Sequence, residues 1–256
     1  MINYRVIPVL LLQNKGLVKT RQFKKPAYIG DPINAIRIFN EKEIDELVFL
    51  DINASKEKRP PDFALLEKIA SECFMPLGYG GGISSIDEVK KIFNIGIEKV
   101  IFNTSLIDNP ELVAQSAALA GSQSVVASID VKKSITGKRR VFRHTTKSIL
   151  DISVTDYARR AEEAGAGEII LNSVDQDGMM GGYDLEMIRK VADTVNIPVV
   201  ACGGAGQLLH FKEAVTKGGA SAVAAGSLFV FHGPHKAVLI NYPDQDILKE
   251  LFKNGE

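Results

Sequence analysis

The sequence is poor in several features that mark specialised proteins: it has no tryptophan, only two cysteines among 256 residues, and no net charge at pH 7. Two cysteines as far apart as Cys73 and Cys202 argue against a disulfide framework or a zinc cluster, so we interpret both as core thiols. Lysine plus arginine equals aspartate plus glutamate at 31 each. No global field therefore attracts nucleic acid or an anionic membrane, and any charged partner must be recognised by local charge.

Long uncharged hydrophobic runs are also missing. The first apolar run contains Pro8, ends at Gln13, and has no basic stretch before it. Such a run is typical of neither a signal peptide nor a membrane span. We therefore expect a cytoplasmic protein that binds neither membrane nor nucleic acid.

What the sequence does contain is ample material for a core, with 45% hydrophobic and 24% charged residues. Short β-branched runs alternate with longer amphipathic runs, which is typical of βα units around a parallel sheet. Eight strands are predicted, at residues 6–11, 47–52, 75–80, 99–103, 124–130, 168–173, 198–202 and 222–226. Eight βα units in a chain of this length favour a single (β/α)8 TIM barrel, with a doubly wound sheet as the alternative.

Several helix starts are marked by capping residues. Asp31 and Asn109 each precede a proline, which favours a side-chain cap followed by proline at the first helical position. Ser85 and Glu88 fit a capping box. The segment 183–195 has apolar residues on one face, so it can cover a sheet.

Two segments interrupt the alternation. Residues 15–30, after the first strand, form a basic stretch that we expect to be an irregular loop able to act as a lid. Residues 132–147 indicate a hairpin inserted after the fifth strand, with a turn at Thr136-Gly137. The hairpin's basic residues can bind a phosphorylated substrate or form a solvated face, and the sequence does not choose between these readings; they are Lys132, Lys133, Lys138, Arg139 and Arg140.

The two halves of the chain echo each other. Glu46 and Glu168 each precede a predicted strand and are 122 residues apart, as are the pairs Gly81-Gly82 and Gly203-Gly204. Asn103-Thr104 corresponds to Gly226-Ser227 at a spacing of 123. A repeat of this length indicates two (βα)4 half-barrels, at about 1–122 and 123–256, within one domain.

The repeated glycines have two readings. Next to strand ends, they let backbone N–H groups approach an anion, and the hydroxyl residues that follow the fourth and eighth strands add donors at helix N-termini. Glycine at a barrel corner also has a purely structural explanation. Because the pattern occurs twice on one rim, we favour a ligand that carries a phosphate-like group at each end.

Taken together, the motifs 46–52, 80–83, 126–130, 178–184 and 203–206 resemble those of the cyclase subunit of imidazole glycerol phosphate synthase, the HisF-like family of histidine-pathway (β/α)8 barrels. The resemblance extends from about Arg5 to Phe231. It implies a subunit that forms a heterodimer with a glutaminase at the bottom of the barrel and receives ammonia through the barrel core. It implies no metal and no cofactor.

The resemblance also assigns roles at the bottom of the barrel. The positions of the family's ammonia gate are occupied by Arg5, Glu46, Lys99 and Glu168. These residues precede or begin four strands, so their side chains can converge and pair. A purely structural ion network is the alternative, because buried ions need partners wherever they occur. Glu98 and Gln123 match positions that would meet the glutaminase.

At the top of the barrel the family uses two aspartates as general acid and base. Asp130 matches one of them, and Leu11 occupies the place of the other. Leucine cannot transfer a proton, and losing a positioned acid or base costs about 10²–10⁴ in rate. Asn172 and Cys202 also replace residues that are usually small and polar or hydroxylic. Other ligand positions are matched by Lys19, Asp51, Gly82, Asn103, Thr104, Asp177, Gly178, Gly204, Gly226 and Ser227.

Two metal-like motifs are rejected. Residues 175–178 resemble the start of a calcium loop, but Met179 and Met180 stand where an EF-hand needs a ligand and a glycine. His232 and His235 have no third ligand nearby in the sequence, so we expect a flexible loop there. His144 and His210 are isolated histidines, which we assign to the surface.

Three functions stay open. The first is a HisF-like subunit that delivers ammonia for sugar amidation in surface-glycan biosynthesis, since family members without the first aspartate resemble partners of N-acetyl sugar amidotransferases. A third protein, the sugar amidotransferase, would receive the ammonia. The second is a working cyclase of histidine biosynthesis. The third is a non-catalytic subunit that senses a bisphosphate and regulates a glutaminase. Whether the chain is itself an enzyme depends on what replaces Leu11.

Overall fold

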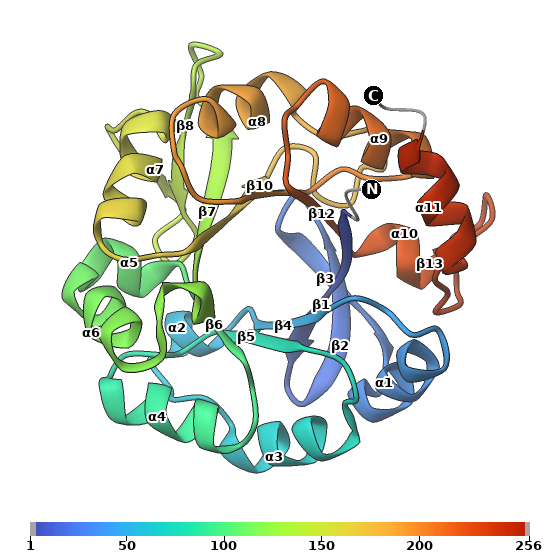
Figure 1. Cartoon of the computed structure of the whole chain (residues 1–256), viewed down its shortest axis with the longest axis horizontal. Coiled ribbons are helices and arrows are strands. Elements are labelled where there is room, and N and C mark those ends of the chain that lie inside the picture. The colour runs from blue at the N-terminus through green and yellow to red at the C-terminus, as the bar shows by residue number, and fades with distance from the viewer. Residues whose placement is uncertain (1–3, 254–256) are drawn as a thin grey trace.

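The computed structural model describes residues 4–253 and contains a closed barrel of eight parallel strands (Figure 1). In chain order the barrel strands are β1 (Arg5–Gln13), β4 (Leu47–Asp51), β5 (Leu77–Gly80), β6 (Lys99–Phe102), β7 (Val125–Lys133), β10 (Glu168–Ser173), β11 (Val199–Cys202) and β12 (Ala222–Ala225). Neighbouring strands pair in that order, β12 returns to β1, and β7 pairs with β10. The (β/α)8 prediction is confirmed, and closure rules out the doubly wound alternative.

A ring of eight helices surrounds the barrel within residues 4–253 (Figure 1). It consists of α1 (Pro32–Glu41), α3 (Phe63–Glu72), α4 (Ile86–Asn94), α6 (Pro110–Ala120), α7 (Val154–Glu163), α8 (Leu185–Ala192), α9 (Leu208–Thr216) and α11 (Gln245–Lys253). Shorter pieces are α2 (Ala54–Glu57), α5 (Thr104–Asp108), α10 (Ser227–Val230) and the 3-10 turn η1 (Ser122–Ser124). No helix in the described part of the chain is long and apolar enough to cross a membrane.

The helix caps follow the sequence in two of three cases. Asp31 caps α1 by accepting from the N–H groups of Ile33 and Asn34, and Ser85 and Glu88 form the capping box of α4. Asn109 does precede α6 with proline at its first position, but its side chain makes no capping hydrogen bond. The predicted Asn109 cap is therefore wrong. A turn of α5 ends directly at this residue, which fixes its backbone between two helices.

The apolar side chains form two cores. The larger lies between the strands and the helix ring and contains outward-pointing residues of β1 such as Val6, Leu10 and Leu12. The smaller lies inside the barrel and contains Ile7 and Val9 from the same strand. This alternation follows from the two-residue period of a strand. It fixes Leu11 as an inward-pointing residue, packed against the inner core.

The segment after β1 is a hairpin rather than the irregular loop that the sequence indicated. Strands β2 (Gly16–Arg21) and β3 (Lys24–Gly30) pair antiparallel, and β2 also pairs with the end of β1. Both connecting turns have two residues with positive φ, Asn14-Lys15 and Gln22-Phe23. Positive φ at both central residues matches the twist of a hairpin, but lysine, glutamine and phenylalanine rarely signal it. That is why the sequence missed these turns.

Two further hairpins project from strand and helix ends. The segment predicted as an insertion contains β8 (Arg139–Arg143) and β9 (Ser148–Ile149), with β8 paired to the extended end of β7. Gly137 has a φ of 79°, as its turn requires. A short hairpin of β13 (Phe231–His232) and β14 (Ala237–Val238) occupies the stretch that we expected to be a flexible loop. Four barrel strands precede residue 123 and four follow it; the half-barrel boundary itself stays a prediction.

Candidate functional site

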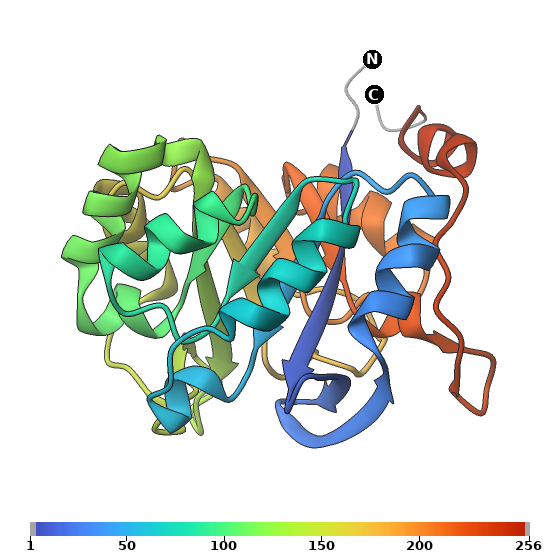
Figure 2. The ribbon, with the colours of Figure 1, turned by 90° about the horizontal axis from the view of Figure 1, so that it is seen from below.

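The barrel has two functionally distinct ends. All eight strands run in the same direction, so their amino-terminal ends meet at one face and their carboxyl-terminal ends at the other (Figure 2). We call these the amino face and the carboxyl face. The carboxyl face contains a pocket that opens to solvent and is lined by residues from the ends of all eight strands or the loops that follow them.

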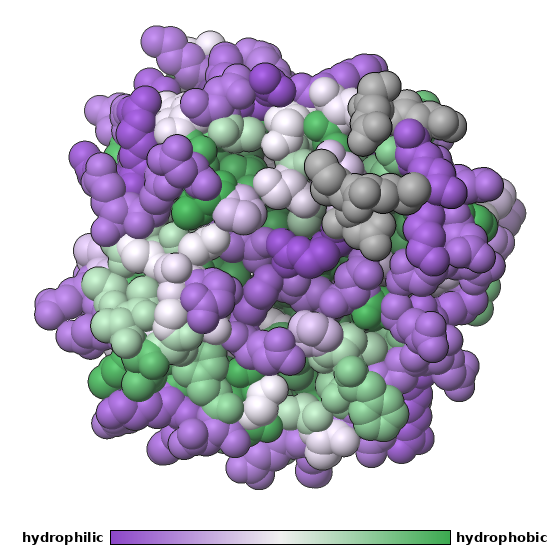
Figure 3. All heavy atoms as spheres, in the orientation of Figure 1, coloured by the Kyte–Doolittle hydropathy of each residue, from purple (hydrophilic) through white to green (hydrophobic). Residues whose placement is uncertain are grey.

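A closed ring of four charged side chains fills the centre of the amino face. Arg5 donates to both Glu46 and Glu168. Lys99 donates to the same two carboxylates, at 2.9 Å from Glu46 Oε2 and 2.8 Å from Glu168 Oε2. The sequence-predicted gate residues are therefore brought together, although whether they act as a gate is a question of function. Figure 3, which views this face, shows hydrophilic residues gathered at its centre.

The ring balances its own charge. Glu46 and Glu168 are almost fully buried, and the cations keep contact with solvent. Burial alone would raise the pKa of Glu168, but the hydrogen bond from Arg5 and the positive charge of Lys99 outweigh burial and lower that pKa. The same carboxylates raise the pKa of Arg5 against the opposing effect of burial. The Glu168 carboxylate and the Arg5 guanidinium are thus held in their charged forms.

Between the ring and the pocket the barrel interior is apolar. Its inner core consists of Ile7, Val9, Val48, Ile101, Val126, Ile170, Val200, Cys202, Ala222 and Ala224, with Leu11 and Leu50 packed against it. The two alanines on β12 are small and fully buried. Cys202 is a buried thiol whose pKa burial raises to about 12, so it stays protonated and inert.

Asp130 is the one pocket carboxyl group in the described residues that has no basic partner. Its two oxygens accept from amides instead, at 3.1 Å from Asn103 Nδ2 and 3.3 Å from Asn172 Nδ2. Burial raises the pKa of Asp130 to about 7, and the two amide hydrogen bonds only partly oppose this shift. The group can therefore gain or lose a proton near neutral pH, as a general acid or base must.

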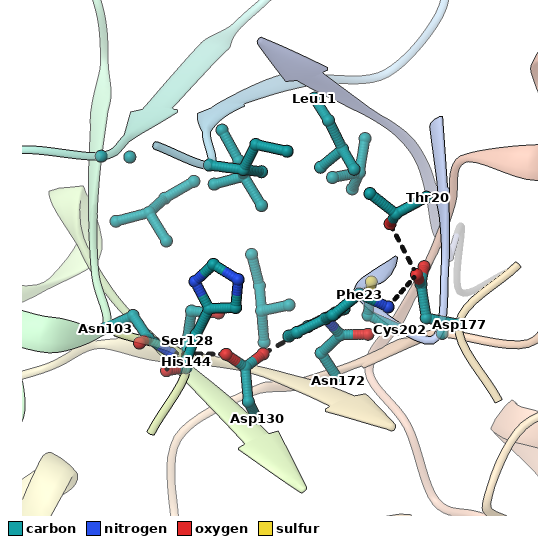
Figure 4. A pocket seen from close by; sticks show the side chains of 18 of the residues that line it. Leu11, Thr20, Phe23, Asn103, Ser128, Asp130, His144, Asn172, Asp177 and Cys202 are labelled. Atoms are coloured by element: carbon teal, nitrogen blue, oxygen red, sulfur yellow. Dashed lines mark hydrogen bonds between the residues drawn. The ribbon is translucent and has the colours of Figure 1, made fainter. Parts of the chain in front are cut away.

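The position opposite Asp130 is occupied by hydrocarbon. Leu11 lies across the pocket from Asp130, and Figure 4 shows apolar side chains around it. Leu50 and Ile101 line the same pocket. Hydrocarbon from Leu11, Leu50 and Ile101 therefore faces the polar group formed by Asp130, Asn103 and Asn172.

The other two pocket carboxylates are each fixed by a cation. Arg59 donates to both oxygens of Asp51 from a single nitrogen, at 2.9 and 2.8 Å, and Asp51 also accepts from two N–H groups at the start of α2. Asp177 accepts from buried Lys19 at 3.0 Å and from the hydroxyl of Thr20 at 2.8 Å. These contacts tie the β2–β3 hairpin to the loop after β10 (Figure 4).

The glycine clusters serve the fold as well as the pocket. A Cβ at Gly82 would lie 2.5 Å from the carbonyl oxygen of Arg59, and one at Gly204 would lie 2.1 Å from that of Gly182. Both glycines also have positive φ, so only glycine fits either position. Their structural role is therefore real, and the case for anion binding depends on other groups.

Ser227 provides such a group. Its hydroxyl is buried at the start of α10, lines the pocket, and has no hydrogen-bond partner among residues 4–253. A buried hydroxyl without a partner is costly, which favours a ligand there. The pocket also includes every ligand position expected from the sequence: Lys19, Asp51, Gly82, Asn103, Thr104, Asp177, Gly178, Gly204, Gly226 and Ser227.

The sequence missed two aromatic pocket residues. His144, which we assigned to the surface, is half-buried and lines the pocket with Phe23. The two rings meet edge to face, with centroids 5.6 Å apart, and Phe23 also lies 6.4 Å from Phe142. Burial lowers the pKa of His144, and the charges of Lys56 and Lys147 add to that effect. Only the folded chain brings the two hairpins together, so no local signal identified this contact.

Several other expected groups lie away from the pocket. None of the five basic hairpin residues lines it, and Arg139 instead pairs with Asp184 and Glu186. Glu98 and Gln123 are exposed on the amino face, beside the strands that they precede. Among residues 4–253, no group of three histidine, cysteine or acidic side chains is arranged to hold a metal ion.

The comparisons with known proteins agree on one family. The sequence profile described as "Histidine biosynthesis protein" matches residues 5–235. The chain is 51% identical over 244 residues to "Putative imidazole glycerol phosphate synthase subunit hisF2" of Pseudomonas aeruginosa, covering 95% of this chain and 97% of that protein. It is 49% identical over 253 residues to a protein of Leptospira interrogans named as the corresponding subunit HisF, covering 98% and 100%.

A third relative carries the same subunit name with a different number. The chain is 46% identical over 256 residues to "Putative imidazole glycerol phosphate synthase subunit hisF3" of Vibrio vulnificus, covering 99% of this chain and 98% of that protein. These matches span the barrel, the charge ring and the pocket residues alike. The chain therefore belongs to the histidine biosynthesis protein family, as a HisF-like (β/α)8 barrel.

Proposed function

We propose that this chain is the ammonia-receiving barrel of a two-subunit glutamine amidotransferase, and that its ammonia serves sugar amidation in surface-glycan biosynthesis rather than imidazole ring closure. One contrast carries the proposal. The amino face has a complete ring of paired charges beneath an apolar interior, whereas the carboxyl face has Leu11 where a cyclase of this family needs an acid.

The interior favours ammonia over ammonium. A neutral molecule enters an apolar region at a small cost, while an isolated ion does so at a very large one. Ammonia released by a glutaminase docked at the amino face would pass the ring of Arg5, Glu46, Lys99 and Glu168 in its neutral form. It would then follow the inner core, where Ala222 and Ala224 leave the smallest side chains, to the floor of the pocket.

The partner in this proposal is a glutaminase that forms a heterodimer over the amino face and contacts Glu98 and Gln123. The relatives are named as subunits, which supports an assembly of this kind. At the carboxyl face, the pocket binds a phosphorylated ligand between its two glycine-rich sides. A third protein, a sugar amidotransferase, takes up the ammonia and attaches it to its own substrate.

The test is a reconstitution of this chain with a glutaminase and a sugar amidotransferase from the same genome. The key variant replaces the whole ring with apolar residues of similar size: Arg5→Met, Glu46→Leu, Lys99→Met and Glu168→Leu. Removing both signs of charge together leaves no unpaired ion, so the barrel should stay folded. We expect glutamine-dependent amidation to fall to the level without glutaminase, while amidation from added ammonium salt is unchanged.

Two outcomes would overturn the proposal, each in favour of another function. If amidation survives while the ring is sealed and glutamine is still hydrolysed, the conduit is wrong and a regulatory subunit becomes the better reading. If the unmodified chain turns over the histidine-pathway intermediate with ammonium salts, it is a working cyclase. Leu11→Asp sharpens this second point, because it should raise a residual cyclase rate by about 10²-fold if the rest of the rim is intact.

A further inference from the structure

The amino face carries an aromatic side chain that no fold requirement explains. Phe74 is 86% exposed and lies in the loop between α3 and β5. Loops that lead into barrel strands lie at the amino face, the same end as the charge ring. A large apolar side chain with this exposure gains nothing from the folded monomer, so its surroundings decide what it can do.

The loop holds Phe74 in a fixed place. The amide of Asn40 bridges it on both sides: Asn40 Nδ2 donates to the Glu72 carbonyl at 2.7 Å, and the Phe74 N–H donates to Asn40 Oδ1 at 3.1 Å. The next residue, Met75, is buried in the outer core. The ring therefore projects from a backbone that is already ordered, which reduces the entropy lost on binding.

Phe74 belongs to a continuous surface. Strands β5, β6 and β7 are neighbours in the barrel, so the loops that enter them lie side by side. We call four exposed residues in or beside these loops the amino-face arc: Phe74, Glu98, Leu119 near the end of α6, and Gln123. Figure 3 shows hydrophobic residues gathered in this half of the face, beside the hydrophilic centre. The negative charge of Glu98 even reaches Cys73, the residue before Phe74, and helps burial raise its pKa to about 11.

We propose that Phe74 is the apolar anchor that selects and seats the glutaminase subunit on the amino face. The inference rests on the proposed function, because ammonia can enter the charge ring without escaping only if a partner covers this face. The arc adjoins that entrance, and it defines the partner's chemistry: an apolar recess for the Phe74 ring and a basic side chain opposite Glu98. Aromatic residues in such desolvated recesses dominate the energy of many interfaces.

The test is binding of a glutaminase subunit from the same genome, measured by titration calorimetry with the full chain. Phe74→Asp should weaken the Kd at least about 30-fold, because it removes the anchor and places a carboxylate in the recess. Phe74→Leu should recover part of the affinity. The matched control is Ile135→Asp, which alters a fully exposed apolar residue on the β7–β8 hairpin. It should bind like the unmodified chain.

The outcomes distinguish an error about Phe74 from an error about pairing with a glutaminase. If the unmodified chain binds the glutaminase and Phe74→Asp binds it equally well, the anchor is wrong while the proposed function stands. If the unmodified chain does not bind the glutaminase, both are wrong. If the chain alone forms a dimer in sedimentation and Phe74→Asp makes it monomeric, the residue serves a second copy, which also overturns the proposal. Thermal unfolding of Phe74→Asp should match the unmodified chain, since the residue is exposed.

Discussion

The amino and carboxyl faces of this barrel handle buried charge differently. At the amino face two cations and two carboxylates meet in one ring, and each carboxylate accepts from both cations. At the carboxyl face three carboxyl groups line the pocket; Arg59 fixes Asp51 and Lys19 fixes Asp177, but Asp130 has only amide partners.

This difference separates a fixed site from a titratable one. The hydrogen bond from Arg5 and the charge of Lys99 lower the pKa of Glu168, so this carboxylate stays charged at neutral pH. Burial raises the pKa of Asp130 to about 7 because the hydrogen bonds from Asn172 and Asn103 offset only part of its effect. The proton of Asp130 is therefore exchangeable near neutral pH. Leu11, which lies opposite, can neither accept nor supply that proton. The barrel thus keeps a permanent charge pattern at the entrance and half of an acid-base pair at the exit.

Removing one cation from the ring should have the largest effect. In Lys99→Met, Arg5 must serve two nearly fully buried carboxylates alone. We expect the free energy of unfolding at neutral pH to fall by about 3 kcal/mol, measured by urea denaturation. The double variant Lys99→Met/Glu46→Leu leaves one ion pair and should regain most of that loss. If Lys99→Met leaves the free energy of unfolding unchanged, the stability of the barrel does not depend on equal numbers of cations and carboxylates in the ring.

Acid should weaken the same ring. The folded pKa of Glu168 lies below its ordinary value, so its stabilising contribution is present above about pH 4.5 and is lost as the pH falls through the folded pKa. Lys99→Met removes the part of that contribution that Lys99 supplies, while Arg5 still donates to both carboxylates. The stability gap between the variant and the unmodified chain should therefore narrow below about pH 4. A gap that stays constant would show that charge is not its cause.

Asp130 should show the opposite pH dependence. Because its pKa rises on folding from 3.8 to about 7, its folded form holds the proton more tightly than its unfolded form. That stability is present below about pH 4 and is lost as the pH rises toward 7. Asp130→Asn should therefore be more stable than the unmodified chain by about 2 kcal/mol at about pH 8, and similar at about pH 4, in thermal unfolding. An unchanged pH profile would place the carboxylate in contact with a cation or water.

The smallest expected effect concerns the unpaired hydroxyl of Ser227. Ser227→Ala removes a buried donor without a partner, so the ligand-free protein should gain about 1 kcal/mol of stability. Binding of inorganic phosphate, followed by NMR, should weaken about tenfold. Ser105→Ala is the matched control, because that hydroxyl already donates to the Ile83 carbonyl and its loss should lower stability. If the two variants change stability and phosphate binding in the same way, Ser227 is not part of the anion site.

Much of the fold could be read from local patterns. The predicted strand at 168–173 coincides with β10, and that at 99–103 differs from β6 by one residue. The prediction at 75–80 began two residues before β5, because Met75 and Pro76 are apolar but precede the ladder. The hairpin at residues 16–30 was missed because its turns place Lys15 and Phe23 in positive-φ conformations that their types do not announce.

The candidate site was predictable only in part. The resemblance to the HisF-like family indicated Asp130, Leu11 and the four charged residues, and the predicted strands placed each of them at or near a strand end. Position along the strands could not show that Arg59 donates to Asp51, or that the rings of Phe23 and His144 pack against each other, since these partners come from different loops. Contacts between loops depend on how each loop folds back over the barrel, and no sequence period records that.

The sequence by itself determined the class of fold, the family and the chemistry available at each strand end: a carboxylate at Asp130, hydrocarbon at Leu11, and opposite charges at Arg5 and Glu168. The tertiary structure decided which of these charges are compensated. Closing the barrel brings residues 163 positions apart into a hydrogen bond at the amino face and isolates Asp130 from every cation within the described residues at the other. Burial and pairing set a pKa, and both exist only in the folded chain.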